Sequence, residues 1–121
     1  MWVIEEGEYL GTHLGWDRAA QFGDGLFETI RIVNGSATYL NAHVERLTDG
    51  LRALGIAEPS QGVEQAILHD LQKIMNEAST RDGVLKIIVS RGDSARGYGY
   101  HDKNAKVTTF FSELPIYNAK L

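Results

Sequence analysis

Polar and apolar residues follow one another along three stretches of the chain in the manner of β-strands. Residues 26–33 mix aromatic and β-branched types with polar ones, residues 84–89 are almost continuously apolar, and residues 107–111 end in two phenylalanines. Successive side chains of a strand point to opposite faces, and β-branched and aromatic residues are enriched there. The pattern predicts a strand in each stretch, and residues 2–4 with the bend near Tyr9 predict a first hairpin.

A tight turn is predicted directly after the strand at 26–33. Asn34 and Gly35 stand there, and residues 37–40 follow as the returning segment. Asn-Gly is the preferred pair for a two-residue turn because both central positions need a positive φ. These residues therefore predict a β-hairpin.

Two helices are predicted between this hairpin and the strand at 84–89. Asn41 and Gly55 suit the two ends of the first, while Ser60 with Glu64 would open the second, which ends near Ala78. Apolar residues recur at helical spacing in both, namely Val44, Leu47, Leu51 and Leu54, then Val63, Ile67, Leu71, Ile74 and Met75. Strands before and after two helices predict an α+β fold, a mostly antiparallel sheet with both helices on one face.

The composition fits one domain with its own core. The chain has 121 residues, 43% of them hydrophobic, and its net charge of -4 argues against a basic surface for nucleic acid or membrane. There is no cysteine for disulfides or thiolate metal sites, and the four histidines lack metal-ligand spacing. No stretch has the pattern of a signal peptide or a membrane span. We expect a cytoplasmic protein without a metal.

Two arginine-bearing segments indicate a local anion site. One runs from Phe22 to Thr29 and on to Arg46, and the other, residues 90–98, contains Arg91 and Arg96. Glycines in both allow the backbone to approach a ligand, and the planar guanidinium matches phosphate or carboxylate oxygens. The residues alone leave open which anion is bound.

These segments, taken in order, resemble a known family. The matching residues are Asp17-Arg18, Gln21-Phe22-Gly23-Asp24-Gly25, Phe27, Asn34-Gly35, His43 and Arg46-Leu47, followed by residues 85–92 and Arg96-Gly97-Tyr98. From about residue 17 to 113 the chain resembles the fold type IV pyridoxal 5'-phosphate enzymes, and among them the aminodeoxychorismate lyases. The resemblance implies a two-domain subunit in a homodimer. Residues 1–113 would be the smaller amino-terminal domain, and residues 114–121 the start of the interdomain linker.

The resemblance implies a reaction of folate biosynthesis, in which 4-amino-4-deoxychorismate is cleaved to 4-aminobenzoate and pyruvate. Aminotransferases of D- or branched-chain amino acids share the fold and much of the first segment, whereas the Arg-Gly-Tyr at 96–98 favours the lyase. Such an aminotransferase, or a non-catalytic module on the same scaffold, remains an alternative. The resemblance places the Schiff-base lysine beyond residue 121, so we expect no catalytic lysine here and no activity from this part alone.

The resemblance also implies roles for single residues. Arg46 matches the arginine that holds the cofactor phosphate, and its alternative is an exposed helix residue paired with Glu45 or Asp49. His43, one helical turn before it, would brace Arg46 or pack against the cofactor side, and its alternative is a structural, hydrogen-bonded histidine. The cofactor implied is pyridoxal 5'-phosphate.

Substrate contacts are implied on one strand and one loop. Phe27 and Thr29 share a strand face that lines the substrate pocket in the family, and their alternative is a place in the core. Arg31 lies on the same face as a candidate cation for the pocket, and its alternative is a surface pair. D-amino acid aminotransferases often have tyrosine in place of Phe27, which weighs against that activity. Arg96 and Tyr98 match loop positions that reach substrate carboxylates, in some relatives across the dimer interface, and their alternative is a solvated turn.

Overall fold

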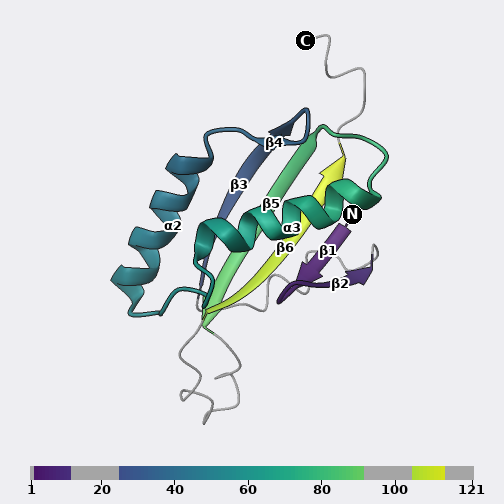
Figure 1. The fold of residues 1–121 in the computed structure, drawn as a ribbon. Coiled ribbons are helices and arrows are strands. Elements are labelled where there is room, and N and C mark those ends of the chain that lie inside the picture. Colours follow the sequence, from purple (N-terminus) through teal and green to yellow (C-terminus); the bar gives the residue numbers. More distant parts are fainter. Residues whose placement is uncertain (1, 12–24, 92–104, 114–121) are drawn as a thin grey trace.

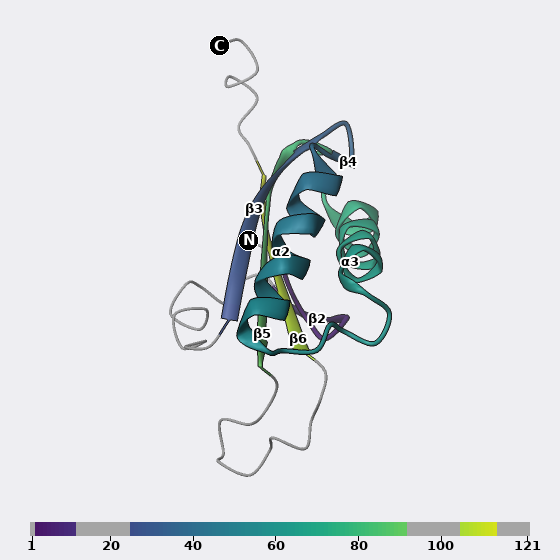
Figure 2. The same ribbon diagram turned by 90° about the vertical axis from the view of Figure 1, so that its left-hand side faces the viewer.

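A computed structural model describes residues 2–11, 25–91 and 105–113 of the chain. The strands β1 (Trp2–Glu5), β2 (Glu8–Gly11), β3 (Gly25–Val33), β4 (Ser36–Ala37), β5 (Gly83–Arg91) and β6 (Ala105–Glu113) form one sheet in the order β2-β1-β6-β5-β3-β4. All its neighbouring strands are antiparallel. The helices α2 (Leu40–Leu54) and α3 (Val63–Glu77) lie on the same side of the sheet (Figure 2). The predicted α+β fold is therefore confirmed.

The two helices cover different parts of the sheet. Figure 1 shows α2 beside β3 and α3 crossing over β5 and β6. The core lies between these layers, where the buried side chains of the sheet meet those of the helices: Ile30, Ile32, Leu47, Leu51, Ile67, Leu71, Ile74, Leu85, Ile87, Val89 and Phe111. Each fully buried aliphatic side chain of this kind stabilises the fold by about 1.5–3 kcal/mol. The apolar helix residues predicted to face the core do so, except that Leu54 is exposed.

The Asn34-Gly35 hairpin is confirmed. Asn34 has φ 52° and Gly35 has φ 79°, as a two-residue turn of this type requires. The returning strand is shorter than predicted, because only Ser36 and Ala37 pair with β3 before the chain turns into α2.

Gly55 ends α2 as predicted, with φ 73° and its N–H directed at the last carbonyls of the helix. The two predicted helix starts were wrong. The residue before α2 is Tyr39, at φ 55°, because the Thr38 N–H already bonds to Arg31 O and the chain enters the helix at Leu40 rather than after Asn41.

The second helix starts after Gly62 rather than at Ser60. Gly62 N donates to Pro59 O over 2.8 Å, so Ser60 lies inside a turn that precedes the helix. The Gly-rich loop predicted at 92–99 and the exit at Leu114 and Pro115 lie outside the described residues. Neither helix in the described ranges is long and apolar enough to cross a membrane.

Candidate functional site

Arg46 on α2 is held by a carboxylate on β3. Glu28 points to the helix-covered face, where its Oε2 lies 3.1 Å from Arg46 Nε and its Oε1 lies 3.0 Å from Arg46 Nη2. This side-on arrangement uses the guanidinium fork in two parallel hydrogen bonds, which fix its direction as well as its position. The predicted alternative partners of Arg46 are not used, because Asp49 pairs with Arg52 and the contact of Arg46 is Glu28.

His43 completes this cluster, one helical turn before Arg46. Its Nδ1 lies 2.5 Å from Glu28 Oε1 and 3.1 Å from Arg46 Nη2. A nitrogen this close to a carboxylate oxygen must share a proton with it, so we assign the proton to Nδ1 and its hydrogen bond to Glu28. Oε1 of Glu28 thus accepts from both His43 and Arg46. The role considered for His43, bracing the arginine, is exerted through Glu28.

Glu28 is ionised in this setting. Its side chain is only 16% exposed, and this burial is the largest single influence and opposes ionisation. The hydrogen bonds from Arg46 and His43, with the charges of both, together outweigh burial and lower the pKa of Glu28. The same hydrogen bond and charge raise the pKa of Arg46.

One end of the arginine remains open to a ligand. The Arg46 side chain is 58% exposed, and its Nη1 has no hydrogen-bond partner among the described residues. Guanidinium carries five N–H groups, and Nη1 contributes two of them. The cluster therefore fixes the guanidinium and leaves two of its donors unused by the described residues.

The predicted pocket residues of β3 lie on the face of the sheet that α2 and α3 do not cover, which we call the open face. Part of this face, around Ile88 and Phe110, is buried. Phe27, Thr29 and Arg31 alternate with the core residues of β3 and are exposed, Phe27 by 60%. Phe27 and Thr29 therefore share a face as predicted, and the alternative that they are core residues is wrong. Thr29 lies opposite Lys86 in the register with β5, and Lys86 Nζ lies 4.3 Å from the centre of the Phe27 ring.

The predicted site residues thus lie on two different sides of the sheet. Arg46 lies on the helix side, and Phe27, Thr29 and Arg31 lie on the open face. β5 pairs with β3 along one edge, from Gly25 to Ile32. At the other edge β4 pairs with Ile32 and Val33, and no described strand pairs there with residues 25–30. Arg96 and Tyr98 lie outside the described residues.

Two residues of this region were missed in the sequence. Glu28 alternates with Phe27 and Thr29 and so had to face the helix, and its acidic type at an inward position was the available signal. Lys86 sits in the middle of an apolar strand, where a charged residue indicates a functional or paired position. Neither partner could be identified without the register of the sheet.

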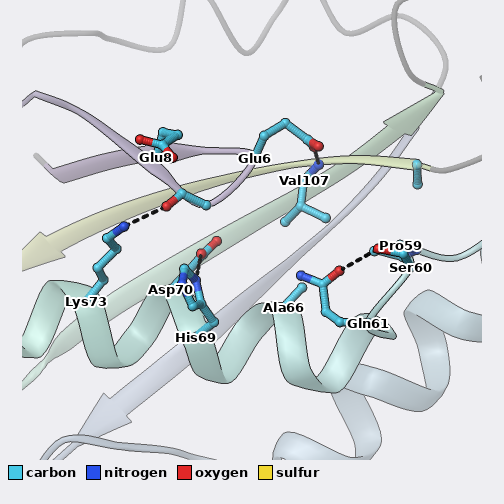
Figure 3. Close-up of a pocket in the computed structure, with 12 residues that line it drawn as sticks. Glu6, Glu8, Pro59, Ser60, Gln61, Ala66, His69, Asp70, Lys73 and Val107 are labelled. Carbon is cyan, nitrogen blue, oxygen red and sulfur yellow. Dashed lines mark hydrogen bonds and ion pairs between the residues drawn. The ribbon is translucent and has the colours of Figure 1, made fainter.

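A separate cavity of about 450 Å³ lies between α3, the β1–β2 turn and the loop before α3 (Figure 3). Several of its polar groups form hydrogen bonds within the fold. Glu6 Oε2 accepts a hydrogen bond from Val107 N over 2.7 Å, Lys73 Nζ donates to Gly7 O over 2.8 Å, and the Asp70 carboxylate is bonded to Thr109 and His69. The bonds of Lys73 and of Asp70 with Thr109 join α3 to the β1–β2 turn and to β6. None of the lining residues belongs to the Arg46 cluster.

The sequence and the fold are similar to those of several known proteins. The chain is 36% identical over 84 residues to a D-alanine aminotransferase of Bacillus licheniformis. The matched stretch covers 69% of this chain and 29% of that protein. The crystal structure of 4-amino-4-deoxychorismate lyase from Pseudomonas aeruginosa matches with a TM-score of 0.65 and 31% identity, over 95% of this chain and 41% of the other. A PLP-bound hypothetical aminotransferase from Mycobacterium tuberculosis matches with a TM-score of 0.69 and 26% identity, over 99% and 42%.

This chain thus spans less than half the length of each of these proteins. The sequence pattern of the amino-transferase class IV family matches residues 25–120, which include both faces of β3 and all of α2. The chain belongs to the amino-transferase class IV family.

Proposed function

We propose that this chain forms one wall of a pyridoxal 5'-phosphate site in a 4-amino-4-deoxychorismate lyase. The observation that carries the proposal is the guanidinium of Arg46, which is held by Glu28 through Nε and Nη2, belongs to a side chain that is 58% exposed, and makes no bond from Nη1 to a described residue. The family membership and the PLP-bound relative support the cofactor. The lyase of Pseudomonas aeruginosa supports the reaction.

The residues present fit a phosphate group. The Arg46 side chain is 58% exposed and its Nη1 makes no hydrogen bond to a described residue. Charge-assisted hydrogen bonds from arginine are the usual means of holding phosphate. The carboxylate of Glu28 is directed at the other edge of the same guanidinium and accepts bonds from it, so it does not occupy the open donors. The chain is acidic overall, so the attraction for phosphate would be local.

The open face would supply the substrate side of the site. Bound pyridoxal phosphate supplies an electron sink for the carbon that bears the substrate amine. Phe27 would pack against the ring of the substrate, and Arg31 and Lys86 would bring cations to its carboxylates. Cleavage breaks the ether bond that holds the enolpyruvyl group, and the products are pyruvate and an aromatic ring.

The rest of the subunit is part of the proposal. We place the amino-terminal domain at residues 1–113 and the start of a linker at 114–121, with the lysine that bonds the cofactor in a second domain. The proposal rests on the share of the relatives that this chain spans, 29% to 42%. A homodimer would bring Arg96 and Tyr98 to the substrate carboxylates.

A second function, transamination of D-amino acids, is supported by one observation. The identity to the D-alanine aminotransferase, 36% over 84 residues, exceeds the 31% identity to the lyase structure. The exposed Phe27 offers no hydroxyl for a substrate carboxylate on the open face, and this favours the lyase.

The test is an assay of the protein extended to the length of its relatives. We expect release of 4-aminobenzoate and pyruvate from 4-amino-4-deoxychorismate with pyridoxal phosphate present. Amino transfer from D-alanine to 2-oxoglutarate without 4-aminobenzoate release would establish the second function instead. Absence of both activities, with no cofactor bound, would reject the family reaction and leave a non-catalytic module.

Arg46→Ala tests the phosphate site within the same assay. Loss of a charge-assisted contact should raise the cofactor concentration needed for half-maximal activity by about 10- to 100-fold. Arg52→Ala is the matched control, because Arg52 lies on the same helix and its ion pair among the described residues is with the exposed Asp49. An equal requirement in the Arg46 variant and the control would remove Arg46 from the site.

A further inference from the structure

Glu28 differs from Arg31, the other charged residue of β3, in the face of the sheet to which it points. It is the acidic residue on the helix-covered face of the strand, and its side chain is 16% exposed. Both of its oxygens are used, Oε2 by Arg46 Nε and Oε1 by Arg46 Nη2 and His43 Nδ1. A partly buried carboxylate that accepts three hydrogen bonds is fixed in one orientation. It therefore restricts the rotamers of the side chains that bond to it.

The side-on bond leaves Arg46 little freedom. An arginine side chain that is 58% exposed would otherwise sample many rotamers, and ordering it upon ligand binding would weaken the affinity. Glu28 fixes Nε and Nη2, so the direction of Nη1 is set before a ligand arrives.

His43 determines how Glu28 itself is oriented. His43 Nδ1 donates a hydrogen bond to Glu28 Oε1 over 2.5 Å. A carboxylate oxygen can accept more than one hydrogen bond, so Oε1 accepts from His43 as well as from Arg46. The charges of the Glu28 carboxylate and the Arg46 guanidinium cancel. The cluster would therefore recognise an anion by the direction of its donors more than by net charge.

We propose that Glu28, supported by His43, is a positioning residue that preorganises Arg46 for the phosphate of pyridoxal phosphate. The inference rests on the proposed function. It adds that discrimination between the phosphorylated cofactor and unphosphorylated pyridoxal depends on a carboxylate that does not touch either ligand.

The test is a double-mutant cycle on the extended protein, with cofactor binding followed by absorbance. The measured quantity is the ratio of the dissociation constants of pyridoxal and pyridoxal phosphate. Glu28→Gln should lower this ratio by roughly tenfold, the equivalent of ordering one long side chain on binding. In the Arg46→Ala background the same change should leave the ratio unaltered, because Glu28 acts through Arg46. Asp49→Asn, which removes the partner of Arg52 on the same helix, is the control and should not change the ratio.

Conservative variants separate positioning from a general effect on the fold. Arg46→Lys keeps the charge but loses the fork, so Glu28→Gln should have little further effect in that background. His43→Asn keeps a donor near Nδ1 and should retain most of the ratio, whereas His43→Leu should lose it. If Glu28→Gln does not fold, Glu28→Asp, which withdraws the carboxylate by one methylene, takes its place with the same expectation.

A second readout needs only the 121-residue chain. Exchange of the Arg46 Nε–H with water, followed by NMR, should be slowed by the bond to Glu28 and should accelerate in Glu28→Gln.

The binding measurements test the proposed function and the positioning role of Glu28 separately. If the wild-type protein binds no pyridoxal phosphate, the proposed function fails. If it binds the cofactor and the ratio is unchanged in Glu28→Gln, falls equally in the Arg46→Ala background, or rises because repulsion between carboxylate and phosphate dominates, the positioning role is overturned and the proposed function stands.

Discussion

The Thr109 hydroxyl donates a hydrogen bond to the buried carboxylate of Asp70, with 2.5 Å between Oγ1 and Oδ2. This bond joins α3 to β6, and His69 Nδ1 lies 3.1 Å from the other oxygen. Burial is the largest influence and raises the pKa of Asp70, while the hydrogen bonds from Thr109 and His69 and the charges of His69 and Lys73 reduce the shift. The folded protein therefore holds the Asp70 proton more tightly than the unfolded chain does.

Asp70→Asn should change how stability depends on pH. Because the folded pKa lies above the ordinary value of 3.8, the stability contributed by Asp70 is full below that value and is lost as pH rises through the folded pKa. Asparagine still accepts from Thr109 and carries no charge. The variant should be at least as stable as wild type near neutral pH and should lose this advantage below 3.8. Urea unfolding at both pH values measures this, and a variant that is destabilised only near neutral pH would contradict it.

Glu28→Gln should show the opposite dependence. The folded pKa of Glu28 is lowered, so its contribution is present above the ordinary value of 4.5 and is lost as pH falls through the folded pKa. We expect the variant to lose about 1 kcal/mol near neutral pH, chiefly from the bond with partly buried His43. The difference in free energy of unfolding should close in acid. A constant difference across the acid range would mean that Glu28 is not ionised in the folded protein.

Phe27→Ala should have little effect on folding. The ring is 60% exposed and its specific contact is with Lys86 Nζ, 4.3 Å from its centre. A cation–π contact at an exposed site contributes about 0.5–1 kcal/mol. The free energy of unfolding, measured by thermal denaturation, should therefore fall by no more than this amount. In the extended protein the same variant should raise the KM for the substrate. A loss of stability as large as that of a core phenylalanine, about 3–5 kcal/mol, would show that the ring packs inside the fold.

Gly83→Ala should destabilise the sheet more than Gly50→Ala destabilises α2. A Cβ at Gly83 would lie 2.5 Å from Phe111 Cζ and 2.5 Å from the backbone oxygen of Ser112, neither of which has room to move. The expected loss is about 1–3 kcal/mol.

The comparison site has a softer neighbour. A Cβ at Gly50 would lie 2.5 Å from Leu26 Cδ1, the end of a flexible side chain. The gain of about 1 kcal/mol in helix propensity offsets much of that contact. Equal losses in chemical unfolding of the two variants would show that the strand accommodates the methyl group as well as the helix does.

Local patterns predicted most of the elements. The Asn34-Gly35 turn, the C-cap at Gly55 and the inward face of α3 follow from rules that operate within a few residues, and the structure confirms each. The starts of both helices were wrong, because each depends on a neighbouring turn: Thr38 bonds to Arg31, and Gly62 bonds to Pro59. A favourable cap residue cannot outweigh backbone bonds that already place the chain.

The sequence by itself determined the periodicity of the elements, the α+β fold and the shared face of Phe27 and Thr29, since alternation along a strand and spacing along a helix are local properties. Only the tertiary structure decided that Arg46 binds Glu28, which lies 18 residues earlier, and that Lys86 stands across from Thr29. Those contacts depend on sheet register and on how α2 packs against β3. Both are set by burial of the whole core, and no short stretch of the chain encodes them.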